Sequence, residues 1–233
     1  MPRAFFPTLF AGSALDPHEL RKFQKLATPV SFRSGETIFS QGEVADAVFG
    51  LSRGVVRLYK QVPDGRRQIL AFALPGDFLG IPLVERYTLS ADAIGEVDLC
   101  RFSHADLAAF IDASPEIMRL IIRFATSELD MARDQLLILG KGSAEQKVAI
   151  FLTSWRNRLA RKTDLPATVP LPMRRQDIAD FLGLTLETVC RELSKLAARN
   201  AIRILPKGVR LLTPEQRICD SLGNLTPDKA SSP

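Results

Sequence analysis

The stretch RQDIADFLGLTLETVCRELSKLAAR, residues 175–199, carries the strongest structural signal in the sequence. Its first part has an apolar helical face that stops at Gly183, a residue type that ends helices because it tolerates a positive φ. Thr185 then predicts the N-cap of a second helix. The apolar residues of that helix repeat at i, i+4 and i+7, namely Val189, Leu193 and Leu196. Two short helices joined by a glycine turn predict a helix-turn-helix.

The second helix has another face, on which polar groups follow the same spacing. Arginine suits guanine O6 and N7, glutamate suits the cytosine amino group, and a helix-turn-helix places such a face in the major groove. The predicted base contacts are Leu186, Glu187, Cys190 and Arg191. The following segments, 201–205 and 209–212, predict a hairpin or wing. The alternative is a helical hairpin that merely lies beside a β-hairpin.

Basic residues concentrate in this half of the chain. Residues 141–233 hold 16 Lys and Arg against 9 Asp and Glu, a net charge of +7, whereas residues 1–140 hold 15 against 17, a net charge of −2. This asymmetry favours a polyanion as partner, although a merely basic surface would give the same count. The predicted phosphate contacts are Arg175, Thr185, Thr188, Ser194, Lys195, Lys207 and Arg210.

A long helix is predicted from Pro115 to about Gly140. Seven apolar residues step by four and three along it: Met118, Ile122, Ala125, Leu129, Ala132, Leu136 and Leu139. This is the a/d seam of a two-stranded coiled coil, so these residues are the predicted interface of a homodimer. The alternative is a helix packed on its own domain, but a second apolar stripe, which includes Ile117 and Phe124, can serve that packing.

The region from Val30 to Phe102 predicts an antiparallel roll or sandwich. Short apolar pieces alternate there with Gly and Pro, and Pro63-Asp64-Gly65 predicts a hairpin turn between residues 55–59 and 68–72. Short helices are expected at 16–27 and 104–112. Ser143 and Gln146 have the spacing of a capping box, which predicts a helix from there to about Ala160.

From about Phe32 to Leu212 the sequence resembles the CRP/FNR family of bacterial transcription regulators. Glu187 and Arg191 match the Glu-x-x-Ser-Arg motif of the FNR branch, with Cys190 in place of the usual serine. The resemblance implies an α+β fold with a cyclic-nucleotide-binding-like antiparallel β-roll, a long dimerisation helix and a C-terminal winged helix-turn-helix. The corresponding ranges are 1–112, 113–140 and 141–215, followed by a partly disordered tail, 216–233.

The resemblance also implies a function. A homodimer would bind a palindromic, TTGA-like site in double-stranded DNA, with Arg191 on guanine and Glu187 on the opposite cytosine, and would act with RNA polymerase in oxygen- or redox-linked control. The chain is closest to the FixK-like group. No enzyme is expected, because catalytic or metal-ligand spacings are missing from the sequence. A kinase regulatory subunit shares the roll but would lack the recognition helix.

No cofactor or metal is expected. Gly76-Asp77-Phe78-Leu79-Gly80 matches the family's cyclic nucleotide pocket, but Ile81 and the segment beginning at Tyr87 replace the clamp residues, with Arg86 one position away. Three scattered cysteines cannot hold an iron–sulfur cluster within one chain. The alternative is a sensor of haem, through His18 or His104, or of another ligand.

The cysteines and the hydropathy point to one compartment. Cys100 is expected in a buried strand, and Cys190 is either a small filler or a redox switch on the DNA-facing surface. With so few cysteines, no signal-like start and no apolar run long enough to cross a bilayer, we expect a cytoplasmic protein without membrane contact.

Overall fold

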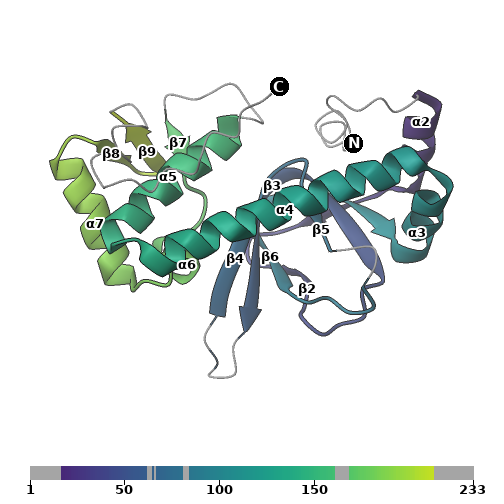
Figure 1. Cartoon of the computed structure of the whole chain (residues 1–233), viewed down its shortest axis with the longest axis horizontal. Helices are drawn as coiled ribbons and strands as arrows, with labels where there is room; N and C mark the ends of the chain where they lie inside the picture. Colours follow the sequence, from purple (N-terminus) through teal and green to yellow (C-terminus); the bar gives the residue numbers. More distant parts are fainter. Residues whose placement is uncertain (1–16, 62–64, 66, 81–83, 161–167, 213–233) are drawn as a thin grey trace. The chain divides into compact units, whose positions relative to one another are not determined.

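Two units make up the chain, residues 1–127 and 128–233. The structure is a computed structural model that describes residues 17–61, 65, 67–80, 84–160 and 168–212. Helix α4 (Pro115–Lys141) carries the boundary between the units (Figure 1). The predicted ranges 1–112, 113–140 and 141–215 treat this helix as a part of its own, and this division remains a prediction. The predicted tail lies outside the described residues.

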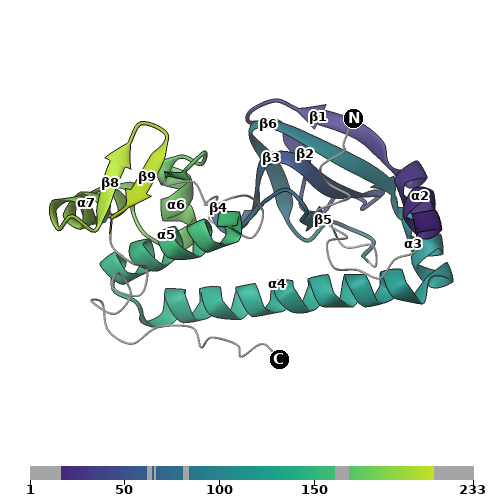
Figure 2. The same ribbon diagram turned by 90° about the horizontal axis from the view of Figure 1, so that it is seen from above.

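The first unit is built on a six-stranded antiparallel sheet in which the strands follow the order β1-β6-β3-β4 (Figure 2). Strand β2 pairs with β6, and β5 pairs with β3. The strands are β1 (Thr28–Phe32), β2 (Thr37–Phe39), β3 (Ala47–Gln61), β4 (Arg67–Ala73), β5 (Phe78–Leu79) and β6 (Ser90–Ser103). Helices α2 (Pro17–Leu26) and α3 (His104–Ala113) flank them in sequence. This arrangement matches the predicted antiparallel roll.

Strands β3 and β6 are 15 and 14 residues long, so the expectation of short strands was wrong for these two. Their internal glycines do not end them. Gly54 adopts a φ of +93° where the β3–β6 register shifts, and a side chain there would collide with the carbonyl oxygen of Glu96. The glycine therefore forms a bulge that bends a continuous strand. Strands β3 and β4 pair antiparallel as predicted, with Leu58 opposite Ala71, whereas Pro63 and Asp64 of the predicted turn lie outside the described residues.

Two apolar clusters stabilise this unit. One fills the roll and includes Phe49, Leu51 and Leu99. The other joins α2 and α3 to the sheet, where the rings of Phe23 and Phe102 stack at 4.8 Å. These cores fix the sheet beside the N-terminal end of α4, since Ile117 belongs to the second cluster.

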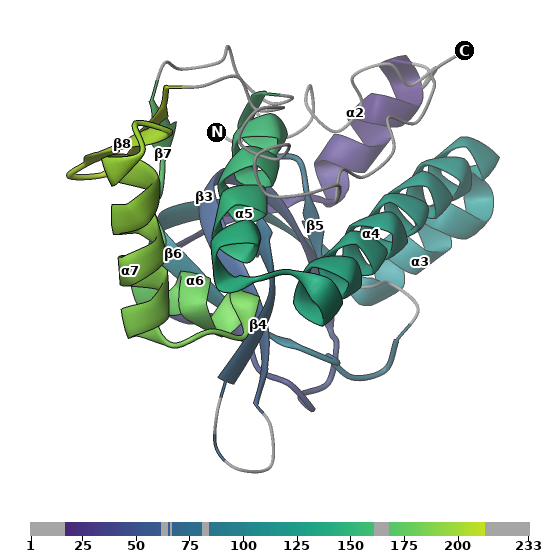
Figure 3. The same ribbon diagram turned by 60° about the vertical axis from the view of Figure 1, so that its left-hand side comes forward.

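The second unit contains α5 (Ala144–Ala160), α6 (Arg175–Leu182), α7 (Leu186–Ala198) and a three-stranded sheet in the order β7-β9-β8 (Figure 3). Its strands are β7 (Val169–Pro170), β8 (Ile202–Leu205) and β9 (Gly208–Leu211). The predicted capping box opens α5, because Gln146 accepts from the Ser143 backbone and Ser143 Oγ accepts from the Gln146 backbone. Helix α4 runs through Gly140 to Lys141, one residue past the predicted end.

Candidate nucleic-acid interface

The turn between α6 and α7 fixes the orientation of the second helix. Gly183 takes the left-handed conformation, with φ 63° and ψ 39°, and the Leu184 backbone donates to the Ala179 carbonyl at 3.0 Å. Ala179 is fully buried, as close packing beside a second helix requires. Thr185 is the N-cap, and its Oγ1 accepts from the Thr188 backbone at 3.1 Å. The helix-turn-helix predicted from local signals is present.

Burial divides α7 into an inner and an outer face. Val189, Leu193 and Leu196 are each at most 3% exposed. The four predicted base contacts lie on the outer face: Leu186, Glu187 and Arg191 are exposed, and Cys190 is half-buried. Leu186 is 43% exposed and adds apolar surface to this face. The outer face of α7 therefore presents a hydrogen-bond acceptor, a donor and an apolar group together to a binding partner.

Hydrogen bonds organise the outer face. Arg175, at the start of α6, donates from Nη1 to the Cys190 sulfur at 3.4 Å. Thr185 and Thr188 share a hydroxyl–hydroxyl bond of 2.9 Å, and Arg191 Nη2 lies 3.5 Å from Thr188 Oγ1. The N-terminal turn of α7 therefore holds its polar side chains in an ordered array.

The remaining predicted phosphate contacts surround this array. All of the predicted set are exposed except Thr188, which is half-buried. Lys207 lies in the turn between β8 and β9, and its carbonyl accepts from the Leu171 backbone at 3.0 Å. A side chain at Gly208 would lie 2.3 Å from the Val169 carbonyl oxygen, so only glycine lets β9 pair with β7 there. This pairing fixes the base of the wing.

Sequence reasoning missed one basic residue of the wing. Arg203 on β8 stands directly opposite Arg210 on β9, and both are exposed. Side chains directly opposite one another on paired strands lie on the same face, and like charges there repel. The pair favours an anionic partner. Only the strand register, which the sequence does not specify, brings the two arginines together.

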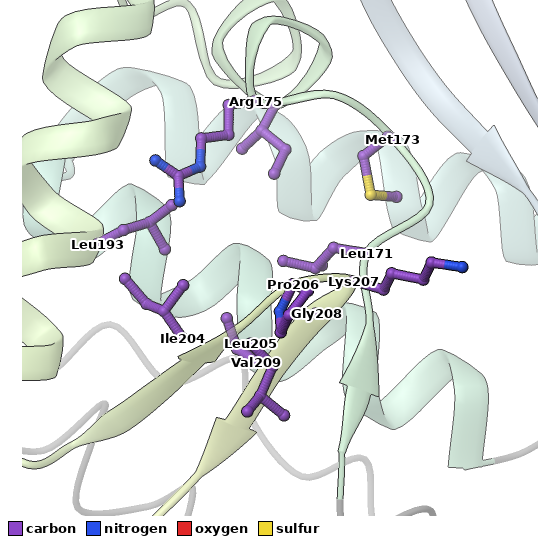
Figure 4. Close-up of a pocket in the computed structure, with 11 residues that line it drawn as sticks. Leu171, Met173, Arg175, Leu193, Ile204, Leu205, Pro206, Lys207, Gly208 and Val209 are labelled. Carbon is purple, nitrogen blue, oxygen red and sulfur yellow. The ribbon is translucent and has the colours of Figure 1, made fainter.

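A groove of about 130 Å³ separates the wing from the helices. Leu171, Met173, Ile178, Leu193, Ile204 and Val209 form most of its apolar lining. Arg175 and Lys207 also line it, and Figure 4 shows Arg175 directed towards α7 while Lys207 points away from that helix. Arg175 and Lys207 therefore do not point towards one common position in the groove.

The predicted dimer seam is exposed over its middle. On α4, Ile122, Leu129 and Leu136 are 56%, 51% and 68% exposed, and the two alanines between them are exposed as well. The end residues differ, because Met118 packs against the core of the first unit and Leu139 is half-buried, with its Cδ2 atom 3.7 Å from where a Cβ at Gly183 would lie. One helix therefore carries an apolar stripe without a partner in the described part of the chain.

Tyr87, which begins the segment that replaces the family's clamp residues, packs inside the roll. Tyr87 is 5% exposed, stacks on Phe39 at 4.0 Å and donates its hydroxyl to the Ala47 carbonyl at 2.7 Å. Its ring also abuts Gly80, where an added Cβ would lie 3.3 Å away. Arg86 is exposed and donates to the Gly42 carbonyl, and Ile81 lies outside the described residues.

The remaining candidate ligands, Cys100, His18 and His104, differ in their burial. Cys100 is buried, and burial raises the pKa of its thiol to about 11. His18 is exposed on α2, whereas His104 begins α3 with its Nε2 atom buried and without a hydrogen-bond partner in the described part of the chain. No group of three or more metal-ligating side chains occurs among the described residues. Among the same residues, no helix is long and apolar enough to cross a membrane.

Comparisons with known proteins agree with this geometry. Residues 29–114 match the cyclic nucleotide-binding domain family, and residues 146–216 match the Crp-like helix-turn-helix domain family. The chain is 52% identical to the transcriptional activatory protein AadR of Rhodopseudomonas palustris, over 87% of this chain and 84% of that protein.

Two further similarities come from Bradyrhizobium. The chain is 51% identical to the nitrogen fixation regulation protein FixK of Bradyrhizobium diazoefficiens, over 87% of this chain and 85% of that protein. The structure of FixK2 from Bradyrhizobium japonicum superposes with a TM-score of 0.77 at 35% identity, covering 84% of this chain and 96% of that chain.

Proposed function

Because the chain belongs to the CRP/FNR family of transcription regulators, which are not enzymes, we propose that it activates genes in the cytoplasm as a homodimer on palindromic DNA. Each half-site would be TTGA-like. The observation that carries this proposal is the outer face of α7, where Glu187 and Arg191 stand exposed beside each other over a fully buried inner face. The relatives named as a transcriptional activatory protein and as FixK support activation, which implies a contact with RNA polymerase.

Base recognition would come from four residues of α7. Arg191 would donate to O6 and N7 of guanine, and Glu187 would accept from the cytosine amino group. Leu186 offers exposed apolar surface for a thymine methyl group, and Cys190 lies between the two charged residues. These assignments use the donor and acceptor groups that differ between base pairs in the major groove.

Phosphate contacts would surround the base contacts and hold α7 in register. They comprise Arg175, Thr185, Thr188, Ser194, Lys195, Lys207 and Arg210, to which we add Arg203. Such contacts carry no sequence information, but they supply most of the salt-dependent affinity. The basic balance of residues 141–233 is consistent with this role.

Dimerisation would occur through the exposed stripe of α4. Burying Ile122, Leu129 and Leu136 against the same residues of a second chain would remove three large exposed apolar side chains from water. A two-fold dimer of this kind presents two copies of α7, which matches a palindromic site.

The roll would act without a cyclic nucleotide, since Tyr87, in the segment that replaces the clamp residues, is packed on Phe39 and Arg86 is engaged with the Gly42 carbonyl. Redox control would act at Cys190 instead. Its thiol lies 3.4 Å from Arg175 Nη1, so an oxidised, anionic sulfur would compete with DNA for that cation. We retain the ranges 1–112, 113–140 and 141–215 as the proposed domains.

A mobility-shift assay with a duplex carrying the TTGA palindrome tests the proposed function. The full-length chain should form one complex at nanomolar concentration, and a duplex of equal length with scrambled half-sites should bind at least about a thousandfold more weakly. Equal affinity for both duplexes would contradict sequence-specific binding. Addition of cyclic AMP should leave both affinities unchanged.

A further inference from the structure

A buried carboxylate lies within the recognition helix, one residue from the base-contacting arginine. The Glu192 side chain is 3% exposed. Its Oε1 atom accepts from Arg191 Nε at 3.2 Å and from Lys195 Nζ at 3.0 Å. Both cations are about half exposed, at 52% and 48%, so the carboxylate is buried while the charges that it holds reach solvent.

We propose that Glu192 is a positioning residue that holds Arg191 in the orientation required for guanine and thereby sets base specificity. The proposal rests on the proposed function, in which Arg191 contacts a base. Glu192 itself would not touch the DNA, because its side chain is buried.

The geometry restrains the guanidinium from two sides. Glu192 engages Nε, and Thr188 Oγ1 lies 3.5 Å from Nη2. Thr188 is in turn tied to the N-cap Thr185. An arginine side chain loses much conformational freedom when it binds, and here part of that freedom is already lost in the free protein. Since Nε is engaged, the terminal amines remain to form the bidentate pair with guanine O6 and N7.

Only one oxygen of the same carboxylate has hydrogen-bond partners among the described residues. Its Oε2 atom is buried and has no hydrogen-bond partner in the described part of the chain. A buried polar atom without a partner destabilises a fold, and apolar replacement of buried ionic groups is often neutral or stabilising. Glu192 is thus better suited to holding the two cations than to filling the core.

The carboxylate is ionised when it performs this task. Burial alone would raise the pKa of Glu192, but the hydrogen bonds from Lys195 and Arg191 outweigh it, so the pKa lies below its ordinary value. A full negative charge therefore lies beneath the base-contacting and the phosphate-contacting cation at neutral pH, and charge-assisted bonds of this kind are the strong ones.

The test compares three full-length proteins: wild type, Glu192→Leu, which removes both oxygens at similar volume, and Arg191→Ala as control. Affinity is measured for the palindrome, for a palindrome with 7-deazaguanine in place of the half-site guanine, and for a scrambled duplex. The 7-deazaguanine duplex lacks the N7 acceptor for Arg191 but keeps the cytosine amino group for Glu187. Glu192→Leu should lower the discrimination between guanine and 7-deazaguanine by about tenfold or more, which corresponds to the loss of one well-oriented bidentate pair. Its affinity for scrambled DNA should be equal or higher, because a negative charge is removed, and its melting temperature should not fall.

If Glu192→Leu discriminates between the two palindromes as well as wild type does, while Arg191→Ala does not, the positioning role is wrong and the proposed function remains intact. If Arg191→Ala itself discriminates like wild type, the base assignment in the proposed function is wrong, and the inference falls with it. If Glu192→Leu has a lower melting temperature than wild type, the same affinities are measured for Glu192→Gln, which keeps the shape of the side chain but removes its charge. An intermediate loss of discrimination then supports the role, and full discrimination overturns it. In the Arg191→Ala background, Glu192→Leu should cause no further loss.

Discussion

Replacing Leu129 with glutamate should separate the proposed dimer into monomers. Leu129 is 51% exposed on α4, and burial of a whole leucine is worth about 1.5–3 kcal/mol, so burial of the exposed half contributes about 1 kcal/mol in each protomer. Two glutamates facing each other across a two-fold axis at roughly 6 Å add about 3 kcal/mol of repulsion at an effective dielectric of about 20. Together these effects amount to about 5 kcal/mol, which raises the dimer Kd by between three and four orders of magnitude, or about 4000-fold.

Sedimentation velocity measures this change directly. Wild type should sediment as a dimer and Leu129→Glu as a monomer at micromolar concentration, with unchanged circular dichroism because the residue already contacts water in one chain. Thr126→Glu is the matched control, since it places the same charge on an exposed neighbour outside the seam, at a position where coiled coils accept glutamate. A Leu129→Glu protein that sediments as the wild-type dimer would refute the assignment of the interface.

Three further outcomes follow from the site. Lys207→Ala should weaken binding to specific and scrambled duplexes alike and reduce the slope of log K against log salt by about 2, because each protomer of the dimer loses one neutralised phosphate; an unchanged slope would remove Lys207 from the phosphate-binding residues. Calorimetry with cyclic AMP should show no binding at millimolar ligand, since Tyr87 packs on Phe39 in the roll, and a micromolar Kd would contradict this. Peroxide should abolish DNA binding by wild type but not by Cys190→Ser, because Cys100 is fully buried and its thiol pKa is raised to about 11; equal inactivation of the serine variant would exclude Cys190 as the switch.

Signals that depend on a few neighbouring residues were sufficient to predict much of this structure. Gly183 and Thr185 mark the ends of two helices by backbone chemistry that acts within one turn, and both perform the predicted role. The capping box at Ser143 is of the same kind. The apolar seam of α4 follows from helical periodicity alone, and its middle residues are exposed as a partner surface requires.

Features that depend on strand register or on packing could not be predicted in this way. Arg203 meets Arg210 only because of the β8–β9 register, and Gly54 ends no strand because the sheet continues through a bulge. Glu192 follows Val189 by three residues, a spacing that places it on the apolar face of the helix, but its residue type would assign it to the surface, since charged residues are seldom fully buried. Its burial results from how α7 packs, and its partners are visible only in three dimensions.

The most direct test of the central claim is an atomic substitution in the DNA. In a palindrome whose half-site guanines are replaced by 7-deazaguanine, the N7 acceptor that Arg191 needs is absent while base pairing is retained. Wild type should bind this duplex about tenfold or more weakly per half-site than the natural palindrome, and Arg191→Ala should bind the two duplexes equally. If wild type does not distinguish the two duplexes, or if Arg191→Ala still does, Arg191 does not contact this guanine.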